Sequence, residues 1–146
     1  MTAEKIDQKI NVSMRIVDFI INEFFVSDNI PHKIVKAIDK GKVQYQFDVG
    51  LNADSMKKEI TIFLKITFFA EPEKSNNLGH LTTTCIFSIA NFEEMLVDSK
   101  VPNIVLASLL GINISSARGA LKVLAVNTLL EDCLIPIINP ASFFKQ

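Results

Sequence analysis

The stretch VQYQFDVGLNADSMKKEITIFLKITFFA, residues 43–70, decides the fold, because it contains two strand patterns separated by a turn. In both patterns apolar residues occupy every second position, and this period is typical of strands that bury one face. The alternating residues are Val43, Tyr45, Phe47, Val49 and Leu51, then Ile60, Ile62, Leu64, Ile66 and Phe68. The polar segment NADSMKK between the two patterns predicts a hairpin turn.

Two further segments, one on each side of this hairpin, carry strand signals. LTTTCIFSIA, residues 81–90, alternates in the same way and is rich in β-branched residues. SMRIVDFIINEFFVS, residues 13–27, is ambiguous between strand and helix, but its β-branched and aromatic content favours a strand. We therefore expect four antiparallel strands in the first 90 residues, with residues 28–42 as a long connection between the first and second strands.

After residue 90 the signals become helical. The segment NFEE, residues 91–94, fits a helix start with Asn91 as the N-cap, and Pro102 suits the first turn of a longer helix that ends near residue 127. Apolar residues are spread around much of that helix, so we expect it to be covered on more than one side. Pro136 and Pro140 limit the remaining tail to a short helix. The sequence therefore predicts an α+β fold: a four-stranded antiparallel sheet, then a long helix, then a short C-terminal helix.

Length and composition restrict the class of protein. The 146 residues, 49% of them hydrophobic, suit one domain over 1–146, in which we expect residues 1–10 to be flexible. A net charge of −1 gives no broad positive field, which disfavours a nucleic-acid partner. No apolar run reaches the roughly 20 residues of a membrane-spanning helix, and the first residues lack the apolar segment of a signal peptide. We therefore expect a cytoplasmic protein that does not insert into membranes.

The sequence contains no arrangement of side chains that predicts catalysis or a cofactor. His32 and His80 have no spacing relation to each other, to a cysteine or to paired carboxylates, and the common nucleotide, hydrolase and zinc motifs are absent. Cys85 and Cys133 stand apart from any CxxC pattern, so we expect both to be buried thiols. We therefore expect neither an enzyme nor a metal or other cofactor.

Small residues form a ridge along the predicted long helix. The ridge residues Ala107, Gly111, Ser115 and Gly119 recur every four positions and therefore share one face, where another backbone can approach closely. Each glycine inside a helix costs about 1 kcal/mol relative to alanine, which favours a packing role. The ridge either packs on the protein's own sheet or contacts another subunit.

The tail LIPIINPASFF, residues 134–144, carries no charged side chain. We expect it either to be tied down in a core or interface, or to hold an apolar partner. Arg118 lies in an otherwise apolar part of the long helix. We expect its guanidinium to pair with a carboxylate or with carbonyl groups, in preference to a ligand.

These segments together resemble the bacterial SecB export chaperones. The resemblance rests on ARGALKVLAVNTLLEDCLIPIINPASFF (residues 117–144), FSIA (87–90) and NIPH (29–32), and it spans roughly residues 14–144. In that family a strand ending in an FSIA-like motif leads to a long helix with an Ala-Arg pair, here Ala117 and Arg118. A Leu-x-Pro-hydrophobic-Asn pattern then opens the last helix, and residues 134–139 correspond to it. The sequence departs from the family pattern at Ser115, Gly119 and Pro140.

The resemblance implies an ATP-independent holdase chaperone that keeps precursor proteins unfolded for secretion. It also implies a homotetramer, a dimer of dimers with helices at the contact, in which the ridge meets the same helix of another subunit. Apolar grooves would bind extended clients through many weak contacts. The client-binding residues would be Ile30, Ile34, Val35, Ile38, Leu134, Ile135, Ile137, Phe143 and Phe144.

The resemblance also concerns the binding of the chaperone to a translocase ATPase, which receives the client. The family docks a translocase ATPase through acidic residues on the outer face of the sheet, and the corresponding positions here are Asn22, Val26 and His80, none of which is a carboxylate. Successive strand residues point to opposite faces, so we expect the neighbouring Glu23 to project away from Asn22 unless a bulge intervenes. Because charge complementarity sets partner choice and encounter rate, we expect weak or absent binding to a standard translocase ATPase.

Two other functions fit the same sequence. A SecB-like subunit would serve one dedicated client, such as an antitoxin, if its binding surface were specialised. Alternatively, the phenylalanine-rich grooves would take up a lipid or another apolar small molecule. Native mass spectrometry distinguishes this last function, because a bound lipid adds a discrete mass.

Overall fold

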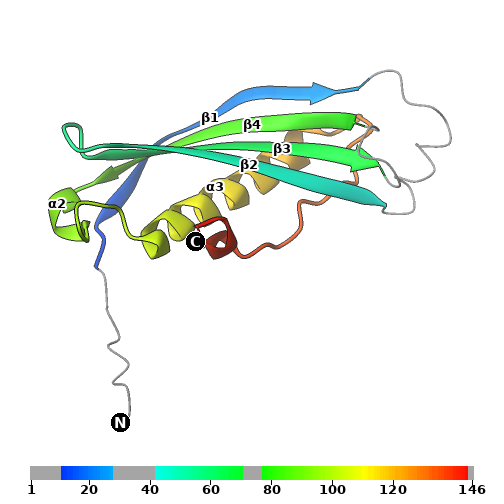
Figure 1. The fold of residues 1–146 in the computed structure, drawn as a ribbon. Helices are drawn as coiled ribbons and strands as arrows, with labels where there is room; N and C mark the ends of the chain where they lie inside the picture. Colours follow the sequence, from blue (N-terminus) through cyan, green and yellow to red (C-terminus); the bar gives the residue numbers. More distant parts are fainter. Residues whose placement is uncertain (1–10, 28–41, 71–76, 145–146) are drawn as a thin grey trace, which may run out of the picture.

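One antiparallel sheet, covered on one face by a long helix, dominates the computed structural model, which describes residues 11–27, 42–70 and 77–144 (Figure 1). The strands are β1 (Met14–Val26), β2 (Val43–Asp54), β3 (Glu59–Ala70) and β4 (Asn77–Ile89), and their order in the sheet is β1-β4-β3-β2. They are followed by α2 (Phe92–Met95), α3 (Asn103–Leu124) and the 3-10 helix η1 (Pro140–Phe144). The expected fold class is confirmed, with a five-residue 3-10 helix as the short C-terminal helix. The expected flexibility of residues 1–10 and the motif NIPH lie outside the described residues.

The predicted hairpin is formed by β2 and β3. The two strands pair without a bulge, from Val43 opposite Ala70 to Asp54 opposite Glu59. The Asp54 carboxylate accepts hydrogen bonds from the backbone N–H groups of Met56 and Lys57, at 3.0 and 3.2 Å, and so closes the turn.

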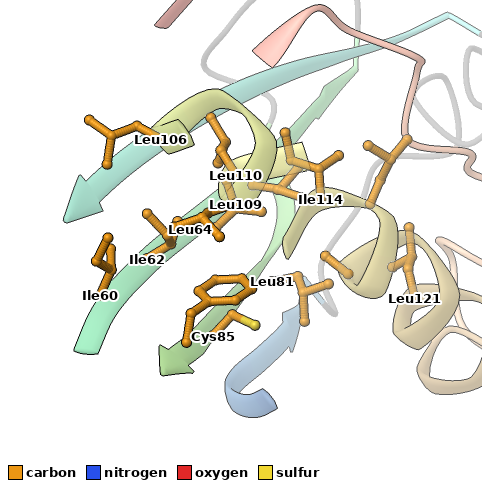
Figure 2. Packing of buried hydrophobic residues seen from close by; sticks show 14 of the residues in the cluster. Ile60, Ile62, Leu64, Leu81, Cys85, Leu106, Leu109, Leu110, Ile114 and Leu121 are labelled. Atoms are coloured by element: carbon orange, nitrogen blue, oxygen red, sulfur yellow. The ribbon is translucent and has the colours of Figure 1, made fainter. Parts of the chain in front are cut away.

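The hydrophobic core lies between the sheet and α3. The alternating apolar residues of β3 are fully buried on the helix side of the sheet, as are Leu81, Cys85 and Phe87 of β4. Figure 2 shows how the side chains of α3 pack on them. The buried apolar residues of α3 are Val105, Leu106, Leu109, Leu110, Ile114, Ala117 and Leu121. The predicted two-residue period is therefore confirmed as the inward face of the sheet.

Helix α3 is long and apolar enough to cross a membrane by length and composition alone. Half of its most apolar window is buried inside the fold, however. Packing on the sheet therefore accounts for much of the apolar character of this helix.

One buried polar contact fixes α3 over the sheet. Asn113 is fully buried, and its Oδ1 accepts a hydrogen bond from the Thr83 hydroxyl at 2.7 Å, while its Nδ2 donates to the Ile62 carbonyl at 2.9 Å. The two partners lie on neighbouring strands, β4 and β3. Because a buried amide is costly without partners, the contact favours one position of the helix along the sheet.

Asn91 is the N-cap residue of α2, as expected, and its carbonyl accepts a hydrogen bond from the Met95 N–H at 3.0 Å. Its side chain makes no cap hydrogen bond to α2. Instead, Oδ1 accepts a hydrogen bond from the Ser13 N–H at 2.9 Å, and Nδ2 donates to the Asn11 carbonyl at 2.6 Å. Asn91 therefore fastens the segment that leads into β1.

The ambiguous segment is a strand, β1, which forms one edge of the sheet and contains two bulges. Its register against β4 shifts between Ile16 and Asp18 and again between Ile21 and Glu23. Val17 and Asn22 are therefore the extra residues of two β-bulges.

Candidate functional site

The uncharged tail folds back along α3 and is fastened at both ends. Near its start, Arg118 donates from Nε to the Ile135 carbonyl at 3.0 Å and from Nη2 to the Pro136 carbonyl at 2.9 Å. At its end, the Nδ2 of Asn103 donates to the Phe144 carbonyl at 2.8 Å. Figure 1 shows the resulting path, from the C-terminal end of α3 back to its first half. The expected structural role of Arg118, pairing with carbonyl groups, is confirmed.

The tail also packs against the helix side of β2. The rings of Phe143 and Phe47 meet edge to face, with centroids 6.1 Å apart. Burial raises the pKa of Tyr45 to about 12, with a further rise from nearby Cys133 and a smaller opposing effect from a hydrogen bond with the Leu134 backbone. The tail therefore covers β2 on the side where α3 covers β3 and β4.

Three side chains of the fastened tail turn outward. Leu134 is 57% exposed, Ile137 is 92% exposed and Phe143 is 37% exposed. Phe144 is half-buried against the core. Ile135 is fully packed inside, so its predicted place among the client-binding residues is wrong: its side chain is already occupied by the core. The other predicted client-binding residues lie outside the described residues: Ile30, Ile34, Val35 and Ile38.

The small-residue ridge meets the tail over part of its length. A Cβ atom added at Gly111 would stand 3.4 Å from the Cγ of Pro140, and Ala107 is half-buried. Ser115 is exposed, and a Cβ added at Gly119 would meet no other side chain or distant backbone within 4 Å among the described residues. The alternative that the ridge packs on the protein's own sheet is therefore wrong at both glycines. The half of the ridge with Ser115 and Gly119 is open.

The bulge at Asn22 rearranges the outer face of the sheet. Asn22 Oδ1 accepts a hydrogen bond from the Thr84 hydroxyl at 2.6 Å, and Glu23 Oε1 lies 2.7 Å from His80 Nε2 on the same face. The ring of Phe25 stacks on His80, with centroids 5.5 Å apart. Glu23 does not project away from Asn22, because a bulge does intervene and its extra residue places both side chains on one face.

Val26 does not belong to this outer face. It stands opposite Gly79 and packs, half-buried, against the core on the helix side. Of the three positions assigned to translocase docking, Asn22 and His80 therefore lie on the outer face and Val26 does not. A carboxylate that sequence reasoning had excluded, Glu23, stands beside His80.

The described residues contain no group of three or more His, Cys, Asp or Glu side chains placed to hold a metal ion. Cys85 and Cys133 are buried free thiols, as expected. Burial raises the pKa of both to about 11, helped by Asp18 near Cys85 and by Asp132 near Cys133. Both thiols are therefore protonated at neutral pH, which makes them poor nucleophiles.

Comparison with known proteins identifies a fold. No family model and no curated protein matches the chain. Among solved structures, the Mycobacterium tuberculosis SecB-like chaperone Rv1957, in complex with a ChAD peptide from the HigA1 antitoxin, is similar over 86% of this chain and 89% of that chain, with a TM-score of 0.61 and 10% identity. A protein of unknown function from Streptococcus agalactiae matches over 80% and 93% of the two chains, with a TM-score of 0.32 and 14% identity, a likeness too weak to use. The four-stranded sheet, the long helix and the short final helix of this chain therefore form a SecB-like fold.

Proposed function

We propose that the protein is an ATP-independent holdase chaperone that binds extended, unfolded segments of client proteins. The observation that carries the proposal is the tail, whose backbone is hydrogen-bonded to Arg118 and Asn103 while Leu134, Ile137 and Phe143 point outward. Leu134 and Ile137 lie at the Arg118 end of the tail and Phe143 lies at the Asn103 end, so an extended client lying along the tail would contact them one after another. The SecB-like fold supports this function, since Rv1957 is a SecB-like chaperone with a peptide bound.

Two client ranges are compatible with such a surface: precursors destined for secretion, or one dedicated client such as an antitoxin. The outer face favours the dedicated client, because a chaperone for secretion would dock a translocase ATPase there through free carboxylates. Here Asn22 bonds Thr84, and the Glu23 carboxylate is paired with His80. A carboxylate engaged within the sheet contributes less to docking a basic partner. The antitoxin peptide bound to Rv1957 is consistent with the same choice.

Replacing Ile137 with serine is expected to reduce holding several-fold. Ile137 is 92% exposed, so the variant loses an apolar contact for the client, while its folding stability changes by no more than about 0.5 kcal/mol. The measurement is light scattering from an aggregating unfolded client without nucleotide. Met56→Ser is the matched control, because Met56 in the β2–β3 turn is equally exposed and lies outside the tail. Equal effects of the two substitutions, or no suppression by the unaltered protein, would contradict the proposal.

We also propose a cytoplasmic homotetramer, a dimer of dimers of about 65 kDa from four 16.3 kDa chains, in which the open half of the ridge contacts another subunit. Gly119→Leu is expected to shift the tetramer towards dimers, because overpacking a close contact costs about 1–3 kcal/mol. Within its own subunit a Cβ atom at this position meets no other side chain or distant backbone within 4 Å among the described residues, and Gly119 is exposed. Light scattering measures the mass, and Ser108→Leu, at an exposed helix position outside the ridge, is the control. An unchanged mass for Gly119→Leu would place the subunit contact elsewhere.

Gly111→Leu would not test the same contact. Gly111 faces Pro140 of the tail, so a larger side chain there displaces η1 from α3.

A further inference from the structure

The two edges of the sheet differ in how they are protected. β1 is interrupted by two bulges, and natural edge strands are commonly protected in this way against pairing with other chains. β2 has neither a bulge nor a proline, and it keeps one register against β3 over its 12 residues. It carries two charged residues, Asp48 near its middle and Asp54 at the turn. β2 is therefore the edge that is more competent to pair.

The direction of the backbone groups of β2 follows from the ladder. The Ile89 N–H donates to the Lys58 carbonyl at 2.8 Å, while Glu59 stands opposite Ser88. In an antiparallel ladder this makes Glu59 and Ser88 a non-hydrogen-bonded pair, so the N–H and C=O groups of Glu59 point away from β4 and towards β2. Because the two kinds of pair alternate along the ladder, the other odd-numbered residues of β3 also direct their backbone groups towards β2. These odd-numbered residues stand opposite the even-numbered residues of β2.

The odd-numbered residues of β2 consequently direct their N–H and C=O groups towards the open edge. They are Val43, Tyr45, Phe47, Val49, Leu51 and Ala53. Among the described residues, no backbone hydrogen bond from another element reaches them. The same six residues carry the side chains on the helix side of the sheet, next to the tail.

We propose that the β2 edge binds an extended client segment as an added antiparallel strand, and that this segment is amphipathic, with apolar residues at alternate positions and a lysine or arginine opposite Asp48. The inference rests on the proposed holdase function and specifies how the client is bound. Antiparallel addition is the more stable of the two pairings.

The apolar face of the added strand follows from its neighbours. Its helix-side residues would lie beside the half-buried side chains of β2, such as Phe47 and Val49, and beside Phe143, which contacts Phe47. Leu51, further along β2, is exposed on the same side. Apolar client side chains would remove these surfaces from water.

The basic residue follows from charge complementarity on the other face. Glu23, Thr82, Lys65 and Asp48 form one row across the four strands, and Asp48 is its outermost member. Asp48 is exposed, and Gln46 Nε2 lies 3.5 Å from its Oδ2. A residue directly opposite on an added strand would have its Cβ about 5 Å away, within reach of an ion pair. A lysine or arginine at that place continues the alternation of charge set by Lys65 and Asp48.

The test uses a labelled, end-capped, 12-residue peptide of alternating valine and threonine, with one central threonine replaced by lysine. In antiparallel addition, the residues opposite the six odd-numbered residues of β2 place their side chains on the helix-side face and direct their own N–H and C=O groups towards β2. Valine occupies these positions of the peptide, so the valine amides point at the protein. N-methylation of the central valine amides is expected to weaken binding at least tenfold in fluorescence anisotropy. N-methylation of the central threonine amides, the matched control, should change it less than threefold. Equal binding of the two methylated peptides would overturn strand addition, and the reverse pattern would overturn the antiparallel arrangement.

A charge exchange tests the basic position independently. Asp48→Lys is expected to weaken the lysine peptide several-fold and to strengthen a peptide with glutamate at that place. Asn52→Lys, on the same face of β2 and farther from the central position, should change neither by more than twofold. An unchanged preference in Asp48→Lys would overturn the assignment of Asp48.

The aggregation assay separates this inference from the proposed function. Suppression of aggregation together with equal binding of the two methylated peptides would overturn strand addition and leave the holdase function standing. Loss of suppression, with peptide binding as expected here, would overturn the holdase function and leave the edge as a peptide-binding site.

Discussion

Replacing Gly79 with alanine is expected to detach β1 from the sheet, at a cost of about 3 kcal/mol or more. Gly79 has a φ of +147°, which side chains rarely permit, and a Cβ atom there would stand 2.1 Å from the Phe25 carbonyl oxygen. Because the obstructing atom is backbone, no side-chain movement relieves the clash. Urea denaturation measures the loss, and hydrogen exchange should show it first in the amides of β1.

Gly50→Ala is the matched control for Gly79→Ala. Gly50 lies in the other edge strand, and a Cβ added there would make an ordinary contact with Phe63 at 3.6 Å. Its free energy of unfolding should change by no more than about 1 kcal/mol, in either direction. If both alanine variants were equally stable, the close approach of β1 to Gly79 would not hold.

Replacing Asn113 with leucine is expected to lower the free energy of unfolding by about 2–4 kcal/mol. The substitution leaves the buried Thr83 hydroxyl without its acceptor and removes the donor to the Ile62 carbonyl. Thr83→Val alone should cost about 1–2 kcal/mol, because the buried Asn113 oxygen then lacks its donor.

The double variant distinguishes a polar network from simple packing. With both Asn113→Leu and Thr83→Val, neither side chain leaves an unpaired group behind, so the combined loss should fall short of the sum by about 1–2 kcal/mol. Denaturant titration of the four proteins of the cycle measures this difference. Strictly additive losses would mean that the Thr83–Asn113 hydrogen bond contributes nothing to the free energy of unfolding beyond the packing of the two side chains.

The hairpin could be predicted from the sequence because one face of β2 and β3 is covered, which imposes a two-residue period. The bulges of β1 broke that period and went unrecognised. The three-residue steps between helix-side residues of β1, from Ile16 to Phe19 and from Ile21 to Phe24, mark the extra residues. Reading those steps would have placed Glu23 on the outer face.

The tail shows where sequence reasoning reaches its limit. Residues 125–139 contain no helix or strand, so no periodicity indicates which side chains point inward. Ile135 and Ile137 are two positions apart in an uncharged stretch, yet one is buried and the other is exposed. Arg118 binds the carbonyl groups of Ile135 and Pro136 and so fixes the backbone between the two isoleucines, and only the folded chain brings these groups to Arg118.

The strand order also sets the time at which the chain becomes able to fold. Among the described strands β1 pairs only with β4, and Met14 meets Ile89, 75 positions later. During synthesis at roughly 5–20 residues per second, β1 must wait about 3–13 s for its complete partner strand, because 63 residues are added after Val26 up to and including Ile89. The β2–β3 hairpin needs only its short local turn and can form within that interval. For those seconds the nascent chain carries an apolar strand with no partner, the same condition as the unfolded clients that the finished protein is proposed to hold.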